Sequence, residues 1–263
     1  MMELNKIYCG DNCDLLGQLP RECIDLVVTS PPYDDLRTYG GHTWDFYGVA
    51  WQLKRVLKPG GVIVWVVADA TKDGSETGTS MEQALHFKRL GLNLHDTMIY
   101  HKEAMPLTHN RYEQHFEYSF VFSKGKPSTF NPIMEKSKRA GESLKSSTRR
   151  HDGKETSPLH NLNNVKDMKI KGNVWFYDIG YMKSSPDHIA FDHPAIFPEK
   201  LAIDHVLSWS NPGDLVLDPF AGSGTTCKAA KELGRNFLGF EINPEYCKIA
   251  ERRIAQGVLD FAS

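Results

Sequence analysis

The sequence predicts an α/β fold built on a mostly parallel sheet that helices cover on both faces. Short apolar runs alternate with segments of helical spacing along the 263 residues, a pattern typical of parallel sheets. Runs such as 24–28 and 62–67 are apolar without a break, as expected of strands buried on both faces. Strands 93–101 and 116–123 are joined by a short link, which allows an antiparallel strand at the sheet edge.

The first elements in chain order are a strand, a helix and a second strand, followed by a Gly/Asp-rich loop that runs to about residue 43. Asp11 is placed to cap the first helix. The second helix carries Trp51, Leu53 and Val56, and Lys58-Pro59-Gly60-Gly61 is expected to form a turn into the next strand. The expected ranges are strand 4–9, helix 12–19, strand 24–29, helix 44–57 and strand 62–67.

The later elements surround a segment of different composition. A polar loop at 69–79 precedes helix 80–90, and we interpret it as an ordinary loop because its acidic residues lack metal-ligand spacing. No metal site is predicted elsewhere. After strands 93–101 and 116–123, the segment 124–172 interrupts the alternation. The last expected elements are strand 173–177, helix 199–210, strand 213–218, helix 224–233, strand 236–240 and helix 244–256.

A turn rich in small residues joins strand 213–218 to its helix. It contains Asp218-Pro219-Phe220-Ala221-Gly222-Ser223-Gly224-Thr225-Thr226, and small residues are needed where a ligand approaches the backbone closely. The free N–H groups at the start of the helix face this turn. Glu241 ends the next strand, about 20 positions further on, where it is placed to accept hydrogen bonds from a ribose.

Two common nucleotide-binding motifs do not fit this turn. A P-loop needs four residues between its glycines and then a lysine, whereas one residue separates Gly222 from Gly224. The dinucleotide fingerprint would need a third glycine at the position of Cys227. The remaining pattern is Asp-Pro-Phe-x-Gly-x-Gly.

A second motif, Thr29-Ser30-Pro31-Pro32-Tyr33, follows the apolar run 24–28. Ser30 therefore lies at the carboxyl end of a buried strand, the edge at which open α/β sheets bind ligands. Two consecutive prolines hold the backbone extended and cannot donate hydrogen bonds. Their neighbouring carbonyl groups are free to accept from a ligand.

Together, the two motifs resemble those of the permuted beta group of DNA amino-methyltransferases. In that family the catalytic motif comes first, the specificity region follows and the cofactor motif comes last, as here. The resemblance covers most of the chain and leaves 124–172 without recognisable motifs. It implies a circularly permuted Rossmann-like class I methyltransferase sheet, S-adenosyl-L-methionine as cofactor, and three parts: a catalytic half at 1–123, a basic target-recognition insertion at 124–172 and a cofactor-binding half at 173–263.

The family motifs assign roles to individual positions. Ser30, Pro31, Pro32 and Tyr33 would be catalytic: the Ser30 hydroxyl and the Pro31 carbonyl accept the hydrogens of an exocyclic amine, and Tyr33 stacks on a flipped-out base. Asp11 would contact the cofactor adenine as well as capping its helix, and the segment 193–198 would pack around the methionine part. The implied cofactor-binding residues are Asp11, Phe197, Asp218, Phe220, Gly222, Gly224, Thr225, Thr226 and Glu241. His101-Lys102 and His115-Phe116-Glu117 are interpreted as maintaining the fold.

The resemblance implies a site-specific enzyme that methylates DNA, with Ser30 favouring cytosine N4. Adenine-N6 members of the group usually carry Asp or Asn at that position, although a hydroxyl can accept hydrogen bonds from either amine. An RNA or protein-amide methyltransferase is an alternative, disfavoured by the motif order. A non-catalytic nucleic-acid-binding module is another, disfavoured by two intact motifs.

The charge distribution points to a DNA-contacting segment. Residues 124–172 contain 12 Lys and Arg against 5 Asp and Glu, whereas the whole chain has a net charge of −2. Such concentrated positive charge suits phosphate contacts, although a solvated loop has a similar composition. The DNA-binding residues predicted here are Lys136, Lys138, Arg139, Arg149 and Arg150.

The cysteines and the apolar runs indicate the cellular compartment. Five cysteines without a CxxC pair fit a reducing cytoplasm. The longest apolar run, 62–68, is too short to span a bilayer, so we expect a cytoplasmic protein with no membrane association. Duplex DNA is the expected partner. The resemblance also suggests a homodimer and a cognate restriction endonuclease, although no residue pattern establishes either.

Overall fold

The computed structural model of the chain describes residues 2–33, 43–103, 111–141 and 165–256. The chain divides into two compact units, Met1–Asn131 with Asn173–Ser263, and Pro132–Gly172. Residues 124–131, which we expected in the basic segment, belong to the first unit. Their backbone bonds explain this: the N–H of Asn131 donates to the carbonyl of Ser208 at 2.8 Å, and that of Ser128 donates to Gly60 at 3.0 Å.

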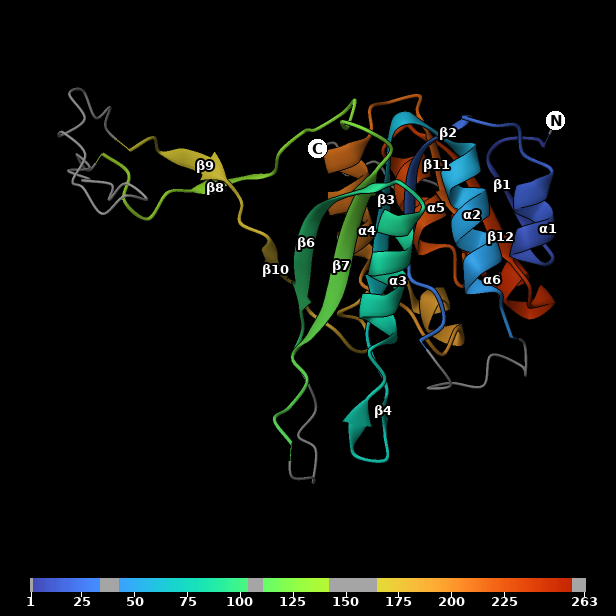
Figure 1. Ribbon diagram of the computed structural model, residues 1–263, viewed down its shortest axis with the longest axis horizontal. Helices are drawn as coiled ribbons and strands as arrows, with labels where there is room; N and C mark the ends of the chain where they lie inside the picture. Colours follow the sequence, from blue (N-terminus) through green and yellow to red (C-terminus); the bar gives the residue numbers. More distant parts are fainter. Residues whose placement is uncertain (1, 34–42, 104–110, 142–164, 257–263) are drawn as a thin grey trace. The chain divides into compact units, whose positions relative to one another are not determined.

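The first unit contains an eight-stranded sheet (Figure 1). Every neighbouring pair in it is parallel except the two pairs made by β7, which confirms the mostly parallel sheet. The antiparallel strand does not lie at the edge, because β6 and β10 add beyond it. In spatial order the strands are β1 (Lys6–Cys9), β12 (Asn236–Glu241), β11 (Leu215–Asp218), β2 (Ile24–Thr29), β3 (Leu57–Val67), β7 (Phe116–Ser123), β6 (Asn93–His101) and β10 (Val174–Phe176).

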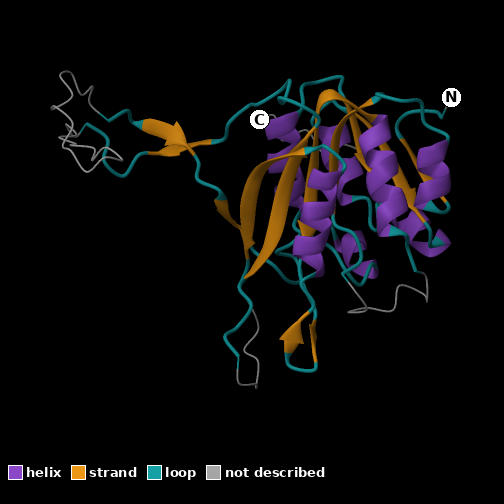
Figure 2. Cartoon of the chain, in the orientation of Figure 1, coloured by secondary structure: helices purple, strands orange, loops and turns teal. Residues whose placement is uncertain are grey.

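Helices cover both faces of the sheet, as expected of an α/β fold (Figure 2). The blue to green helices α1–α3 lie in front of the sheet in Figure 1, and the orange to red α4–α6 behind it. Their bounds are α1 (Asn12–Gly17), α2 (Phe46–Val56), α3 (Thr79–Arg89), α4 (Glu199–Trp209), α5 (Thr225–Glu232) and α6 (Pro244–Ala255), with a 3-10 helix at His188–Asp192.

Local sequence explains where several elements begin. Asp11 caps α1 as predicted, because its carboxylate accepts from the N–H groups of Cys13 and Asp14. Asn243 caps α6 in the same way, with Pro244 in the first turn. The predicted turn before strand 62–67 is instead part of β3. Leu57 already pairs with Ile24, and the register shifts before Leu26 pairs with Val62.

The core of the first unit lies between the sheet and its front helices. Trp65 of β3 is fully buried against Phe87 of α3, with ring centroids 5.1 Å apart. Its indole N–H donates to Gln83 Oε1 at 2.8 Å, so burial leaves this polar group satisfied. The large buried side chains explain why the strands read as continuous apolar runs in the sequence.

The polar loop at 69–79 is partly ordered as a small hairpin. It contains β4 (Thr71–Lys72) and β5 (Ser75–Glu76). Asp69 accepts hydrogen bonds from the backbone N–H and the hydroxyl of Ser80, at 2.8 and 2.6 Å. Within the described ranges, no three His, Cys, Asp or Glu side chains are grouped so that they could hold a metal ion. The described helices are all too short or too polar to cross a membrane.

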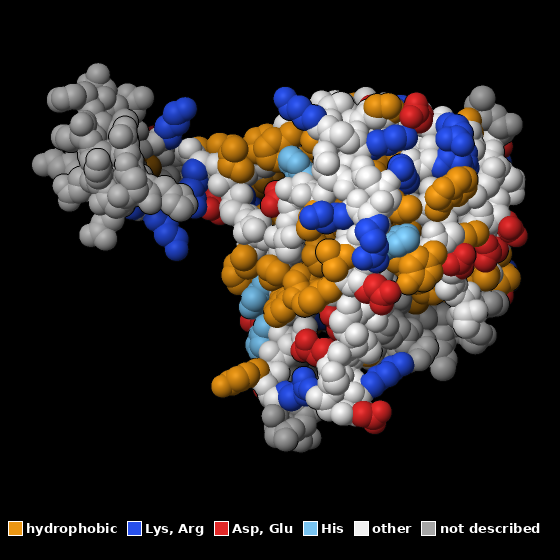
Figure 3. Space-filling model, in the orientation of Figure 1, with side chains coloured by type: hydrophobic (Ala, Val, Ile, Leu, Met, Phe, Trp, Pro, Cys, Tyr) orange, Lys and Arg blue, Asp and Glu red, His pale blue; other side chains and the backbone are white. Residues whose placement is uncertain are grey.

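The second unit contains a two-stranded antiparallel hairpin of β8 (Met134–Lys136) and β9 (Met168–Ile170). Lys136, Lys138 and Arg139 are exposed on it, and Figure 3 shows its Lys and Arg side chains in blue. The described residues of this unit include six Lys and Arg against two Asp and Glu. Arg149 and Arg150 lie outside the described residues.

Candidate active site

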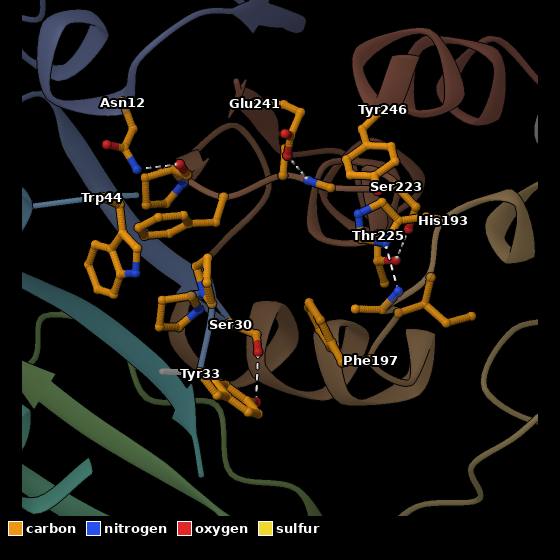
Figure 4. Close-up of a pocket in the computed structure, with 18 of the residues that line it drawn as sticks. Asn12, Ser30, Tyr33, Trp44, His193, Phe197, Ser223, Thr225, Glu241 and Tyr246 are labelled. Carbon is orange, nitrogen blue, oxygen red and sulfur yellow. Dashed lines mark hydrogen bonds between the residues drawn. The ribbon is translucent and has the colours of Figure 1, made fainter. Parts of the chain in front are cut away.

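The two sequence motifs line one cavity of about 380 Å³ in the first unit (Figure 4). They meet because β2 and β11 are parallel neighbours in the sheet, so the segments that follow them emerge at the same edge. A buried hydrogen bond joins the two strand ends: the Thr29 hydroxyl donates to Asp218 Oδ1 at 2.7 Å. All four residues of Ser30–Tyr33 line the cavity.

Glu241 fixes the Gly-rich turn at the opposite side of the cavity. Its Oε2 accepts from the Gly222 N–H and its Oε1 from the Asn243 N–H, both at 2.9 Å. Gly222 has a φ of +51°, and a Cβ there would lie 3.2 Å from the His193 ring. A glycine is therefore needed for both the backbone conformation and the space.

Six of the nine predicted cofactor residues line the cavity, and three support it from behind. Gly224 faces α6, where a Cβ would lie 2.9 Å from the Cβ of Ala250. The Thr226 hydroxyl donates to the Val28 carbonyl at 3.1 Å, and Asp218 is buried. These three therefore shape the turn without facing the cavity. The six that line it are Asp11, Phe197, Phe220, Gly222, Thr225 and Glu241.

Asp218 is a buried carboxyl group beneath the turn. Burial raises its pKa to about 6, although the hydrogen bonds from Thr29 and from the Phe220 N–H act to lower it. Because this pKa lies above its unfolded value of 3.8, the folded protein holds the Asp218 proton more tightly than the unfolded chain does. The stabilisation from this bound proton is fully present below pH 3.8. This contribution is lost as the pH rises through about 6.

We therefore expect Asp218→Asn to flatten the dependence of stability on pH. The amide keeps an acceptor for Thr29 but carries no charge to bury. Relative to the parent, the variant should gain up to about 3 kcal/mol of unfolding free energy between pH 4 and pH 8, because the pKa shift of about two units is worth that much. Urea unfolding at several pH values measures this. Parallel stability curves for the two proteins would contradict the assignment.

A buried arginine supports the Gly-rich turn from α6. Arg253 is 0% exposed, and its Nη1 donates to the Ser223 carbonyl, the Ser223 hydroxyl and the Thr225 hydroxyl at 2.8, 2.9 and 3.0 Å. Its Nε donates to Asp187 Oδ2 at 2.9 Å, and its Nη2 to Glu199 Oε2 at 3.4 Å. Burial alone would raise the pKa of Asp187, but its hydrogen bonds from Arg253 and Ile189 N–H lower it.

Ser30 and Tyr33 belong to a hydrogen-bonded series that reaches the neighbouring strands. The two hydroxyl groups are 2.8 Å apart, and the Tyr33 hydroxyl donates to Glu117 Oε2 at 2.7 Å. Lys102 forms an ion pair with the other oxygen of Glu117. Burial, and next the Glu117 charge, raise the pKa of Tyr33 well above its ordinary value, so the phenol stays neutral.

Sequence reasoning missed several residues that line the cavity. Lys102 and Glu117 were interpreted as maintaining the fold, yet both line it. A signal was available, because Glu117 is the one charged residue of the strand Phe116–Ser123, which is rich in aromatic residues. Trp44 packs edge-on against Phe220 with ring centroids 4.8 Å apart, and no sequence motif marked it. Tyr246 contacts His193 in the same way at 4.2 Å.

The donor set and shape of the cavity fit S-adenosyl-L-methionine. Both N–H bonds to Asp11 go to Oδ1, which leaves its Oδ2 to accept from an adenine amino group. The aromatic rings of Trp44 and Phe220 provide an apolar wall for a base. Glu241 lies at the cavity for ribose hydroxyls, and Phe197 adds apolar surface near the Gly-rich turn.

Comparisons with known proteins agree with this fit. The family model described as DNA methylase, of the N6 and N4 amino-methyltransferases, matches residues 24–252. The orphan methyltransferase M.BamHII of Bacillus amyloliquefaciens is 52% identical over 240 residues, with 90% of each chain covered. The type II methyltransferase M.BglII of Bacillus subtilis is 32% identical, covering 94% of this chain and 68% of that protein.

A solved structure extends the likeness to the fold. TTHA0409 of Thermus thermophilus, in complex with S-adenosyl-L-methionine, has a TM-score of 0.63 and 26% identity, with 97% of each chain covered. The chain therefore belongs to the DNA methylase family of N6 and N4 amino-methyltransferases. It is an S-adenosylmethionine-dependent DNA methyltransferase.

We expect Glu241→Ala to weaken the binding of S-adenosylmethionine at least tenfold. The change removes the acceptor that holds the Gly222 and Asn243 N–H groups, and hydrogen bonds to a charged group are worth about 1.5–3 kcal/mol each. Isothermal calorimetry gives the affinity. Glu245→Ala is the matched control, because its exposed side chain pairs with Lys248 within α6. An unchanged affinity in Glu241→Ala would refute the role.

Proposed function

We propose that the protein is a site-specific methyltransferase that acts on the exocyclic amino group of a flipped-out base in duplex DNA, with cytosine N4 favoured over adenine N6. The observation that carries the proposal is the meeting of Ser30-Pro31-Pro32-Tyr33 with the Gly-rich turn at one cavity. A base amine bound by the first motif lies in the same cavity as a cofactor bound by the second.

In the proposed mechanism the chain activates the amine. An exocyclic amine is a poor nucleophile because its lone pair is delocalised into the ring. The Ser30 hydroxyl and the Pro31 carbonyl accept its two hydrogens, which favours tetrahedral nitrogen and localises the lone pair. When bound, S-adenosylmethionine supplies an electrophilic methyl group on a sulfonium. Alignment in the cavity then contributes much of the rate.

The choice of cytosine rests on Ser30 alone. A hydroxyl is smaller than the Asp or Asn side chain found at this position in adenine-N6 members of the resembled group. Both bases present the same kind of amine, so the product of the reaction is the deciding observation.

The proposal assigns DNA contacts to the basic second unit. Lys136, Lys138 and Arg139 are exposed on it, and exposed cations supply the sequence-independent part of DNA affinity by contacting phosphates. Arg149 and Arg150 are included from the sequence alone. The same proposal assigns target recognition to 124–172, catalysis to the half at 1–123 and cofactor binding to the half at 173–263.

The family resemblance suggests two further partners, a second copy of the chain and a cognate restriction endonuclease. A cytoplasmic location is proposed from the five cysteines, all free. RNA and protein-amide substrates lose support from the DNA methylase family match, and a non-catalytic module loses support from the two motifs meeting at one cavity.

The direct test is to incubate the protein with unmethylated genomic DNA and S-adenosylmethionine, digest the DNA to nucleosides and analyse them by mass spectrometry. We expect N4-methylcytosine. N6-methyladenine would keep the mechanism and reject the inference from Ser30. Neither product, with cofactor binding intact, would reject DNA as the substrate and move the search to RNA and protein amides.

A further inference from the structure

A continuous series of polar groups leads from the cavity into the sheet. It begins at the Ser30 hydroxyl, passes through the Tyr33 hydroxyl at 2.8 Å and reaches Glu117 Oε2 after a further 2.7 Å (Figure 4 shows the first bond). Lys102 holds Glu117 Oε1. Glu117 is 9% exposed. Its hydrogen bonds are therefore made largely away from water, where they are stronger than bonds at the surface.

The number of hydrogens fixes the direction of every bond in this series. A tyrosine hydroxyl has one hydrogen, and Tyr33 donates it to the Glu117 carboxylate. Tyr33 must therefore accept in its bond with Ser30, and Ser30 must donate its own single hydrogen to Tyr33. Only the lone pairs of Ser30 Oγ then remain for a ligand in the cavity.

The charged and titratable groups that face Glu117 are Lys102, Tyr33 and Tyr100. Lys102 forms an ion pair with Glu117. Burial, and next the Glu117 charge, raise the pKa of Tyr33 and of Tyr100 above the ordinary value. Both phenols therefore remain neutral and Tyr33 remains a donor.

We infer that Glu117, held by Lys102 and acting through Tyr33, is a positioning residue that makes Ser30 Oγ a pure hydrogen-bond acceptor toward the target base, and that it receives the proton which the methylated amine releases. This inference rests on the proposed function. It adds a selection rule: a base that presents an amine satisfies Ser30, whereas a base that presents a carbonyl at the same place meets a second acceptor.

The proton balance of the reaction is complete within these residues. As the nitrogen lone pair forms the new N–C bond, the electron pair of the broken C–S bond stays on sulfur, and the nitrogen becomes cationic and acidic. Its proton passes to Ser30 Oγ while the Ser30 proton passes to Tyr33 and the Tyr33 proton to Glu117. The nitrogen ends as a neutral methylamine and Glu117 as a neutral acid, which later returns its proton to water.

The preference of Ser30 for an amine can be tested with pairs of bases that differ only in carrying an amine or a carbonyl at the same position. Uracil replaces the amine of cytosine by a carbonyl, and hypoxanthine does the same for adenine. We would measure the affinity of the protein for two duplexes that differ only at the base found to be methylated. The parent should bind the amine duplex more tightly. In Tyr33→Phe, Ser30 is free to turn its hydrogen toward the base, so the preference should shrink about tenfold, the value of one hydrogen bond.

Glu117→Gln is a sharper variant because it should reverse the bonds. Lys102 would take the amide oxygen, which leaves the amide N–H2 facing Tyr33 and makes Ser30 a donor to the base. We expect the preference for the amine duplex to be lost or inverted and the single-turnover methylation rate to fall at least tenfold. Glu117→Asp, which keeps a carboxylate, should restore both in part.

Tyr47→Phe is the matched control, because its hydroxyl donates to Glu82 at 2.9 Å on the exposed surface, away from the cavity. Cofactor affinity by calorimetry, expected within twofold of the parent, verifies folding for every variant. Parent-like preference and rate in either Tyr33→Phe or Glu117→Gln would overturn the inference while leaving the proposed function intact. A parent that methylates no base would instead overturn the proposed function.

Discussion

Ser30→Ala is expected to lower the rate of methyl transfer about a hundredfold or more and to leave the affinity for S-adenosylmethionine within about twofold. The hydroxyl is the acceptor that localises the lone pair of the amine. The loss of one preorganised polar group at the reacting centre costs about 10²–10³ in rate. The side chain lies across the cavity from the turn that Glu241 fixes, so cofactor binding should be unaffected.

Single-turnover kinetics with saturating DNA measure the rate, and calorimetry measures the cofactor affinity. Ser75→Ala is a suitable control, because it removes an exposed hydroxyl from the hairpin β4–β5, outside the cavity. A loss of cofactor affinity as large as the loss of rate would show that Ser30 acts on the structure of the cavity. In that case its assigned role would be wrong.

The fold was predictable because the apolar patterning is strong. Unbroken apolar runs such as that of β3 indicate strands with two buried faces, and Gly or Asp residues mark their ends. The antiparallel position of β7 followed from its short link to β6. Its place inside the sheet did not, because β6 pairs on its outer side. Beyond β6 lies β10 (Val174–Phe176), which comes from beyond the basic segment and pairs with β6 only in the folded chain.

The lining of the cavity was predictable where a motif, or the spacing from one, marks the residue directly. Gly222, Ser30 and Glu241 are residues of this kind. Lining residues that come from pairing between distant strands were not visible in the sequence. Glu117 enters the site because it pairs opposite Tyr100 across β6 and β7, a register that local spacing does not specify.

Supporting residues were the hardest to recognise, and Arg253 illustrates the reason. It follows Arg252 in an amphipathic helix with a polar face, so in the sequence the two arginines look equally exposed. In the structure Arg252 pairs with Asp192 at 3.6 Å with a side chain 60% exposed, whereas the side chain of Arg253 is 0% exposed. A helix turns by about 100° per residue, so two consecutive side chains point in different directions. Arg252 faces solvent, and Arg253 faces the Gly-rich turn.

Arg253→Met is expected to destabilise the protein by about 3–5 kcal/mol, the usual cost of removing one partner from a buried ion pair. Asp187 and Glu199 would remain buried, with Lys228 alone to compensate Glu199. The apolar replacement fills the space of the side chain, so the effect reports the lost charge and hydrogen bonds rather than a cavity.

The same variant should also weaken S-adenosylmethionine binding, because the Ser223 and Thr225 hydroxyls beside the cavity lose a common donor. Denaturant unfolding and calorimetry measure the two effects. Arg252→Met is the matched control and should change stability by less than about 0.5 kcal/mol, as surface ion pairs usually do. Arg253→Lys should lie between them, since an ammonium keeps the charge but cannot reproduce the planar set of five donors. Equal stabilities for the two methionine variants would show that the buried network does not hold the cofactor turn.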